Sequence, residues 1–301
     1  MIIVIVGPTG VGKTKLSIEL AKKYNAEIIN GDSVQVYKNM NIGTAKITDK
    51  EKENIKHHLF DIKDVTENYS LYDYQQDARN IINKIKSKNK NIIIVGGTGL
   101  YIKSVLYDYN LSNEPKYNEE YTDKSTEELY NELITIDKDI IIDKNNRRRI
   151  IRAINYYKNN NKSISKNKNG NTLLYNNVIF IGLTIDDRNI LYARINKRVD
   201  EMIQNGLLEE VKKFYDQKIN SRILLSAIGY KELYQYYDGK ITKKEAIELI
   251  KRNSRRYAKR QYTFFKNQFN IKWFNINLGN FDNTINEVIN YIENKDYISR
   301  I

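Results

Sequence analysis

The chain has 301 residues, no cysteine, 41% hydrophobic residues and a formal net charge of +13. The lack of cysteine excludes disulfides, thiol nucleophiles and cysteine-based zinc fingers, and it fits a reducing cytoplasm. The length and composition predict a folded soluble protein with one large core and one further unit. The positive charge favours a polyanionic partner such as nucleic acid. The alternative is an AT-rich genome, which raises the Lys and Asn content of all its proteins.

Short apolar runs predict the strands of a buried parallel sheet. The first run, Ile2 to Val6, has no basic leader and ends at glycine and proline, so we expect a strand and neither a signal peptide nor a membrane span. Further strands are expected at 26–30, 91–95, 178–183 and 272–276, with helices at 13–24 and 71–86. Repeated strand-helix-strand units predict an α/β core.

A phosphate-binding loop follows the first predicted strand. Its sequence, Gly-Pro-Thr-Gly-Val-Gly-Lys-Thr, matches the G-x-x-x-x-G-K-[ST] pattern between a strand and a helix. Glycines let backbone N–H groups turn toward phosphate oxygens, while the lysine supplies charge and the threonine offers a hydroxyl to Mg²⁺. The candidate phosphate ligands are Gly7, Pro8, Thr9, Gly10, Val11, Gly12, Lys13 and Thr14. The motif predicts a P-loop NTPase-like parallel sheet and a di- or triphosphate ligand, and it leaves the reaction open.

Asp32 follows the second predicted strand, at the edge where open α/β sheets bind ligands. From position alone, its carboxylate either faces the phosphate-binding loop or caps a turn. The strand at 91–95 runs into Gly-Gly-Thr-Gly, where a kinase or NTPase would place an Asp that holds Mg²⁺. These glycines indicate close approach of a substrate or, equally well, a simple turn.

Residues 112–172 interrupt the strand-helix rhythm and predict an inserted helical domain, with the core formed by 1–111 and 173–301. Helical patches lie at 126–134 and 147–157. The tract 158–171 is almost entirely Asn, Lys, Ser and Gly, which favours a mobile solvated loop over a structured segment. The second patch begins with a basic group that includes Arg148, Arg149 and Arg152.

Residues 187–269 predict mostly helices, and the last of these, at 243–269, has a basic face. On this face the basic residues form two rows with a spacing of four. One row is Lys251, Arg255 and Lys259, and the other is Arg252, Arg256 and Arg260. The opposite half carries Ile247, Ile250, Tyr257 and Phe264, which we expect to pack against the core. No acidic residue falls between 251 and 266, so contact with an RNA backbone is favoured over a merely solvated face.

Several motifs, taken in chain order, resemble the tRNA dimethylallyltransferases. They are residues 7–14, Asp-Ser at 32–33 through Tyr37, Met-Asn-Ile-Gly-Thr-Ala-Lys at 40–46, His-His-Leu at 57–59, Gly-Gly-Thr-Gly-Leu-Tyr at 96–101, Ile-Gly-Tyr-Lys at 228–231 and Lys-Arg-Gln at 259–261. The resemblance covers nearly the whole chain. The chain lacks the Cys/His zinc finger that eukaryotic relatives often carry, so it is similar to the compact bacterial type.

The resemblance implies an enzyme that moves a dimethylallyl group from dimethylallyl diphosphate to N6 of the adenosine beside the anticodon. It further implies Mg²⁺ as cofactor, the tRNA anticodon stem-loop as partner, and a cytoplasmic monomer without a membrane. We expect the adjacent His57 and His58 to be structural, because two histidines without other ligands rarely hold a metal.

The same resemblance assigns roles to individual residues. Asp32 is expected to accept the N6 proton, and Lys13 and Thr14, with Mg²⁺, to stabilise the leaving diphosphate. Arg194 and Arg198 stand four apart on one helix face and either clamp the diphosphate or form a solvated face. Thr9 is an expected active-site contact. The implied RNA contacts are Asp32, Ser33, Val34, Gln35, Thr98, Arg148, Arg149, Arg152, Gly229, Tyr230, Lys231, Lys259, Arg260 and Gln261.

Three other functions compete with this one on the residues alone. A small-molecule kinase would use the same loop for ATP and would transfer the γ-phosphate. A non-catalytic RNA-binding NTPase module would need the basic helix and would be indifferent to Asp32. A prenyltransferase acting on free adenine nucleotides would have no use for extended basic surfaces.

Overall fold

The computed structural model describes residues 1–109, 111, 120–166 and 171–300, which fall into two compact units. The larger unit comprises Met1–Val105 and Tyr175–Ile301, and the smaller comprises Leu106–Leu174. The sequence places the insertion at 112–172, a few residues inside this division. The loops that follow the predicted strands, at the ligand-binding edge of the sheet, all belong to the larger unit.

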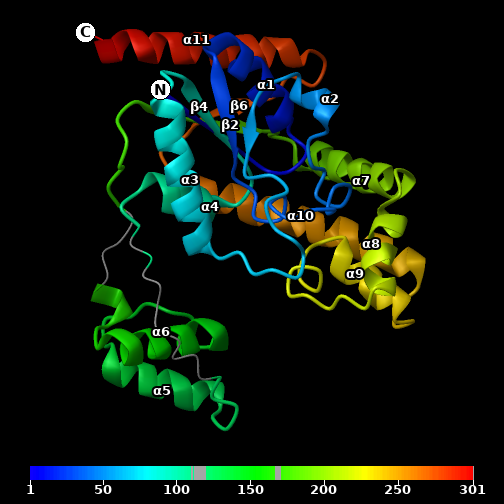
Figure 1. The fold of residues 1–301 in the computed structure, drawn as a ribbon. Coiled ribbons are helices and arrows are strands. Elements are labelled where there is room, and N and C mark those ends of the chain that lie inside the picture. The colour runs from blue at the N-terminus through cyan, green and yellow to red at the C-terminus, as the bar shows by residue number, and fades with distance from the viewer. Residues whose placement is uncertain (110, 112–119, 167–170, 301) are drawn as a thin grey trace. The chain divides into compact units, whose positions relative to one another are not determined.

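The larger unit is built on one six-stranded sheet with the order β3-β2-β4-β1-β5-β6 (Figure 1). Its strands are β1 (Ile2–Val6), β2 (Ala26–Asn30), β3 (His57–His58), β4 (Asn91–Val95), β5 (Val178–Thr184) and β6 (Lys272–Asn275). Every neighbouring pair is parallel. The predicted α/β class, a P-loop-like parallel sheet flanked by helices, is confirmed. The two-residue β3 was not expected, because a histidine pair is too short and polar to read as a strand.

Helices connect and cover these strands. They are α1 (Lys13–Tyr24), α2 (Asp49–Lys52), α3 (Leu71–Lys86), α4 (Gly99–Leu106), α7 (Arg188–Gln204), α8 (Leu207–Asp216), α9 (Tyr230–Tyr237), α10 (Lys243–Gln268) and α11 (Phe281–Arg300). Reciprocal capping boxes begin two of the longest: Ser70 with Asp73 at α3, and Thr242 with Glu245 at α10. In the described part of the chain, no helix has both the length and the apolar character needed to cross a membrane.

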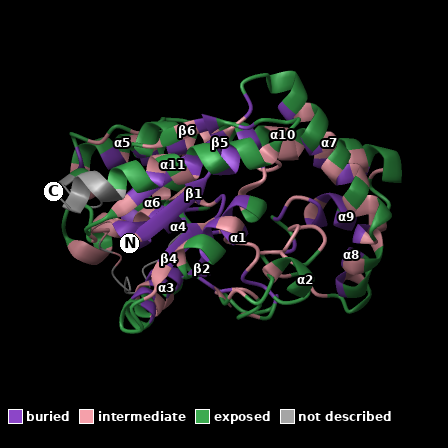
Figure 2. Ribbon diagram, turned by 90° about the horizontal axis from the view of Figure 1, so that it is seen from above, coloured by how far each residue is buried: buried purple, intermediate pink, exposed green. Residues whose placement is uncertain are grey.

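The core explains why the sequence of β1 is a continuous apolar run. All residues of β1 are buried, and Figure 2 shows this strand in the buried colour. Ile3 packs in one cluster with Leu20 of α1 and Val288 of α11, whereas Val4 points to the opposite face because side chains alternate along a strand. A sheet buried on both faces leaves its carboxyl edge as the place where polar side chains meet.

The smaller unit contains α5 (Thr126–Ile136), α6 (Arg147–Asn160) and the short 3₁₀ helix η1 (Ile164–Lys166). Leu129 and Leu133 of α5 pack against Ile150 and Ile154 of α6, which gives the unit its own small core. The expectation of a loop over 158–171 needs correction, because α6 continues to Asn160 and η1 follows. Residues 167–170 of that tract lie outside the described residues.

Candidate functional site

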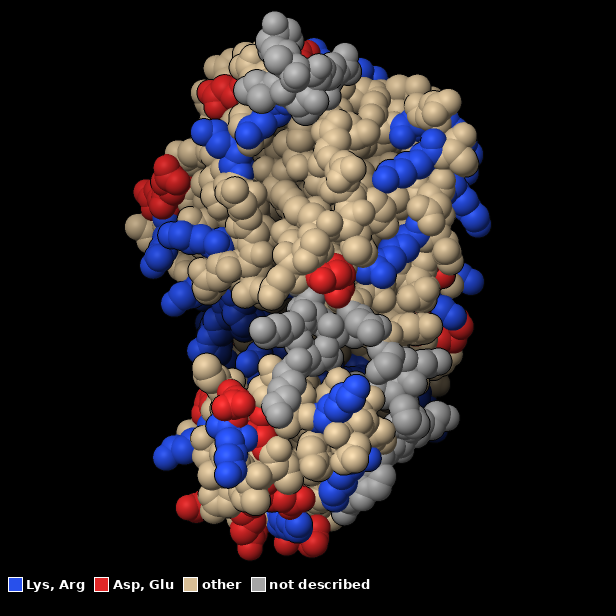
Figure 3. Space-filling view, turned by 90° about the vertical axis from the view of Figure 1, so that its left-hand side faces the viewer, with Lys and Arg blue, Asp and Glu red and all other residues tan. Residues whose placement is uncertain are grey.

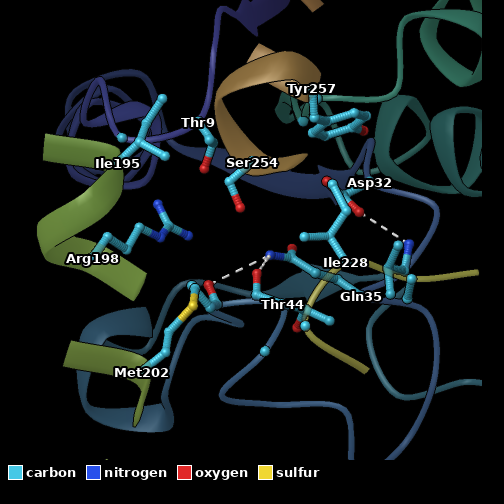
Figure 4. Close-up of a pocket in the computed structure, with 18 of the residues that line it drawn as sticks. Thr9, Asp32, Gln35, Thr44, Ile195, Arg198, Met202, Ile228, Ser254 and Tyr257 are labelled. Atoms are coloured by element: carbon cyan, nitrogen blue, oxygen red, sulfur yellow. Dashed lines mark hydrogen bonds between the residues drawn. The ribbon is translucent and has the colours of Figure 1, made fainter. Parts of the chain in front are cut away.

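A cavity of about 770 Å³ opens at the carboxyl edge of the sheet, entirely within the larger unit (Figure 4). The loops that follow β1, β2 and β4 all line it, and α7, α10 and residues 223–231 complete its walls. The three loops meet because parallel strands direct their carboxyl ends to one edge. The cavity therefore joins the phosphate-binding loop and Asp32 in one space.

The phosphate-binding loop has the backbone geometry that its glycines predict. Gly10 and Gly12 have φ angles of +87° and +88°, which favour glycine. Because Gly12 is the N-cap of α1, no side chain of that residue covers the first N–H groups of the helix. Thr9, Gly10, Gly12, Lys13 and Thr14 line the cavity, whereas Gly7, Pro8 and Val11 are buried beneath it. The loop thus offers backbone donors and a helix terminus to an anion.

Asp32 satisfies both alternatives that its position left open. Its carboxylate accepts a hydrogen bond of 2.9 Å from the backbone N–H of Val34, which is a local cap, and it also lines the cavity. Burial raises the pKa of the Asp32 carboxyl, against the opposing effects of that N–H group and the Lys13 charge. A partly desolvated carboxylate with a raised pKa is suited to accept a proton.

Three cationic side chains line the cavity near the start of α1. Lys13 Nζ donates to the carbonyl oxygens of Gly7 at 2.9 Å and Pro8 at 2.8 Å. Burial, followed by the charge of Arg198, lowers the pKa of Lys13 to about 7, while Asp32 raises it. Arg194 Nε donates to the Gly10 carbonyl at 3.1 Å. These cations make the glycine-rich end of the cavity suited to a diphosphate.

Arg198 lies opposite Asp32 across the cavity, with Thr9 and Ser254 between them (Figure 4). Burial lowers the pKa of Arg198, and the charge of Asp32 raises it. The two side chains thus affect each other electrostatically. Of the alternatives left open for the α7 arginines, a solvated face does not describe Arg198, because its side chain points into the cavity.

The expected RNA contacts around the cavity fall into two groups. Ser33, Val34, Gln35, Gly229 and Lys231 line it. Thr98 instead supports the lining: its hydroxyl accepts a 3.0 Å bond from the Ser33 N–H and donates to Ser33 Oγ at 3.2 Å. Tyr230 is fully buried, and its hydroxyl donates to Glu210 Oε1 at 2.5 Å. The expectation that its side chain touches RNA is corrected accordingly.

Gln261 has an internal role that the sequence did not predict. Its side chain is buried, with Oε1 accepting from the Thr9 N–H at 3.1 Å and Nε2 donating to the Gly97 carbonyl at 3.1 Å. One amide group therefore ties the loop after β1 to the loop after β4. Gln261 also lines the cavity, so its contact with RNA stays a prediction beside this internal role.

The basic face of α10 is smaller than its sequence predicts. Lys251 forms an ion pair of 2.7 Å with Asp200, and Arg255 donates to Asn196 Oδ1 at 2.6 Å. Both partners belong to α7, so spacing within α10 could not reveal them. The side chains that remain exposed on this face are Arg252, Arg256, Lys259 and Arg260.

In the smaller unit, Arg148, Arg149 and Arg152 are exposed on α6, as contact with RNA would require. The neighbouring Arg147 instead donates to the Tyr121 carbonyl within the unit. On the face shown in Figure 3, Lys and Arg side chains are scattered over the surface. The structure thus identifies separate basic positions on α6 and α10.

Three residues of α10 that line the cavity, Ile250, Ser254 and Tyr257, were not predicted as site residues. Ser254 and Tyr257 both line the cavity, and Figure 4 shows Tyr257 beside Asp32. Tyr257 was expected to pack into the core. A usable signal existed, because Ser254, Tyr257 and Gln261 are spaced three and four apart and so share one helix face. Burial, followed by the charge of Asp32, raises the pKa of Tyr257.

The histidine pair lies in β3 and is held by protein groups. His58 Nε2 lies 2.7 Å from Glu27 Oε2, and His57 Nδ1 lies 2.8 Å from the Ile55 carbonyl oxygen. Among the residues that the structure describes, no three or more His, Asp or Glu side chains gather in a metal-binding group. These contacts hold both rings in place, and His57 also lines the cavity.

Comparison with known proteins gives consistent matches. Residues 35–268 match the family model described as IPP transferase. A tRNA dimethylallyltransferase of Anoxybacillus flavithermus is 50% identical over 98% of this chain and 96% of its own length, and that of Bacillus subtilis is 49% identical over 91% and 90%.

Solved structures match as well. The full-length tRNA isopentenylpyrophosphate transferase of Bacillus halodurans superimposes with a TM-score of 0.77 at 42% identity, covering 100% of this chain and 99% of that one. A eukaryotic dimethylallyltransferase acting on tRNA gives a TM-score of 0.85 at 31% identity, covering 99% and 79%. These matches extend over both units.

Proposed function

The chain belongs to the IPP transferase family, and from that premise we propose that it transfers a dimethylallyl group from dimethylallyl diphosphate to N6 of the adenosine beside the tRNA anticodon. The observation that carries this proposal is the single cavity shared by the phosphate-binding loop and the Asp32 carboxylate. Products are N6-isopentenyladenosine and diphosphate. We further propose that the protein works as a monomer in the cytoplasm, because all the cavity residues named above come from one chain.

The donor diphosphate is proposed to occupy the end of the cavity near α1. Backbone N–H groups of the loop after β1 and the start of α1 donate to its oxygens. Lys13, Arg194 and Arg198 supply positive charge, which matters most as negative charge develops on the leaving group. Arriving phosphate charge would also favour the protonated form of Lys13, whose pKa is held near 7.

Thr14 is proposed to hold Mg²⁺ when the diphosphate is bound. This hydroxyl is exposed to the cavity in the first turn of α1, and Mg²⁺ commonly binds few protein groups together with phosphate oxygens and water. The residues therefore fit the ion. When bound, Mg²⁺ neutralises charge on the departing diphosphate.

Asp32 is proposed to act as the general base. The amine of adenine is a poor nucleophile because its lone pair is delocalised into the ring, so proton removal must accompany attack on the allylic carbon. The carboxylate accepts that proton as the new N–C bond forms and the C–O bond to diphosphate breaks. Tyr257, beside Asp32, offers an aromatic surface to the extruded base.

The exposed cations of α6 and α10 are proposed to hold the anticodon stem-loop through its phosphates. Extruding a base costs a few kcal/mol of stacking, which phosphate contacts can offset. On α10 the available residues are Arg252, Arg256, Lys259 and Arg260, and on α6 they are Arg148, Arg149 and Arg152. Charge placement on both units favours tRNA over a free nucleotide as acceptor.

Replacing Lys259 by Ala is expected to weaken RNA binding and to reduce the slope of log affinity against log salt by about one, because one phosphate contact is lost. Fluorescence anisotropy with an unmodified stem-loop at several salt concentrations measures both quantities. Lys251→Ala is the matched control on the same helix. It removes an ion pair with Asp200 and should leave the salt slope unchanged. Equal slopes for both variants would contradict an RNA contact at Lys259.

Transfer of label tests the proposed function directly. The protein is incubated with labelled dimethylallyl diphosphate and Mg²⁺, and unmodified tRNA, ATP or AMP is offered as acceptor. We expect label in tRNA only. Label in the nucleotides alone would instead identify an adenine-nucleotide prenyltransferase. Transfer of the ATP γ-phosphate to a small molecule, with no prenyl transfer, would identify a kinase.

A further inference from the structure

Glu210, in the first turn of α8, makes an unusual set of contacts with a loop far away in the sequence. Its Oε2 accepts hydrogen bonds from the backbone N–H groups of Asn41 at 2.9 Å and Ile42 at 2.8 Å. Its Oε1 accepts from the Gly43 N–H at 3.0 Å and from the Tyr230 hydroxyl at 2.5 Å. Four donors thus converge on one carboxylate, a backbone arrangement that binds anions.

The contact is tight as well as polar. A Cβ atom on Gly43 would lie 2.5 Å from Tyr230 Cε2, so the loop backbone rests directly on the aromatic ring. Tyr230 is fully buried, and burial, followed by the charge of Glu210, raises the pKa of its hydroxyl. Tyr230 therefore stays a proton donor to Glu210.

The anchored loop, residues 40–46, is connected to the cavity. Gly43, Thr44 and Ala45 line it, and Gln35 Nε2 donates to the Thr44 carbonyl oxygen at 3.0 Å. The backbone N–H of Gln35 in turn lies close enough to the Asp32 carboxylate to lower its pKa. A continuous chain of contacts therefore runs from Glu210 through the 40–46 loop and Gln35 to the general base.

We propose that Glu210 is a positioning residue that fixes the 40–46 loop and Gln35 in the shape that receives the RNA acceptor. The proposal rests on the proposed function, because it assigns Glu210 to the acceptor side of that reaction. The hydrogen bonds of Glu210 go to the 40–46 loop and Tyr230, and not to the phosphate-binding loop or the α7 arginines that are proposed to hold the donor. Glu210 should therefore affect the two substrates unequally, which a purely structural residue would not do.

Glu210→Gln provides the test. The amide replaces one carboxylate oxygen with an NH₂ donor, which then faces two other donors. With labelled dimethylallyl diphosphate and unmodified tRNA, we expect kcat/KM for tRNA to fall at least about tenfold, and KM for dimethylallyl diphosphate to stay within about twofold. Glu209→Gln is the matched control, since Glu209 is the exposed neighbour on the same helix and loses the same charge. It should behave as wild type.

Two further measurements make the outcome decisive. In the Glu210→Gln protein, amide hydrogen exchange at Asn41, Ile42 and Gly43 should quicken, whereas Glu209→Gln should leave it unchanged. Tyr230→Phe keeps the ring against Gly43 and removes one donor, so tRNA kcat/KM should fall about two- to threefold, and this variant decides the question if Glu210→Gln does not fold.

Two results would overturn the proposal: equal changes for both substrates, or unchanged kinetics together with protected amides. Absence of tRNA modification by the wild-type protein would instead refute the proposed function. Amide exchange would then still show whether Glu210 holds the 40–46 loop.

Discussion

Asp32→Asn is expected to lower the rate of prenyl transfer by about 10²- to 10⁴-fold, the usual contribution of a general base. Asparagine keeps the shape and can still accept the bond from Val34, but it cannot take the N6 proton. RNA affinity should stay within about threefold, because phosphate contacts elsewhere dominate it. Single-turnover transfer with saturating donor measures the rate, and anisotropy measures the affinity.

Asp186→Asn is the control for this variant, because Asp186 is an exposed carboxylate that follows β5 at the same sheet edge. Its transfer rate should equal that of wild type. The wild-type pH profile adds a second check. Because burial raises the pKa of Asp32, activity should decline, as pH falls, at a higher pH than an ordinary Asp would give. An Asp32→Asn protein with near-normal turnover would rule out this carboxylate as the base.

Lys13→Ala should lower kcat/KM for dimethylallyl diphosphate by about 10²- to 10³-fold, since it removes a buried charge that faces the leaving group. The affinity for tRNA should change little. The control is Lys15→Ala, because Lys15 is exposed on the same helix and pairs with Asp282 at 2.9 Å. Steady-state kinetics with varied donor at saturating tRNA measure the effect.

Lys13 should also give the wild-type protein a characteristic pH dependence. Its pKa near 7 means that the free enzyme loses this positive charge as pH rises through that value. The kcat/KM for the donor should therefore decrease above about pH 7, and this decrease should be absent in Lys13→Ala. If kcat/KM of the Lys13→Ala protein still decreases above about pH 7, another group must be responsible for the decrease.

Much of this arrangement follows from the sequence, because it depends on short-range patterns. Apolar runs such as residues 2–6 are uninterrupted because β1 is buried on both faces, and the glycines of the loop after β1 are required by its backbone angles. Parallel pairing then brings the loops after β1 and β2 together without any further information. Position alone left Asp32 either facing the phosphate-binding loop or capping a turn, and the family resemblance favoured the first.

Other parts of the site depend on partners that the local sequence does not contain. Lys251 has a partner in its own helix, Glu248 at 3.5 Å, but its shorter ion pair, of 2.7 Å, is with Asp200 of α7. Tyr230 matches a motif, yet its hydroxyl is directed at Glu210, which lies on another helix. Gln261 similarly joins two loops that are far apart in the chain. Sequence spacing identified the right segments here, but only tertiary contacts assign the direction of each side chain.

The most direct test of the central claim is a crystal structure of the protein with an unmodified anticodon stem-loop and an unreactive thiodiphosphate analogue of the donor. The account predicts that the diphosphate lies on the loop formed by Gly10, Gly12 and Lys13, with the target adenine N6 within about 3.2 Å of an Asp32 carboxylate oxygen. An adenine bound outside the cavity, or a diphosphate held away from that loop, would contradict it.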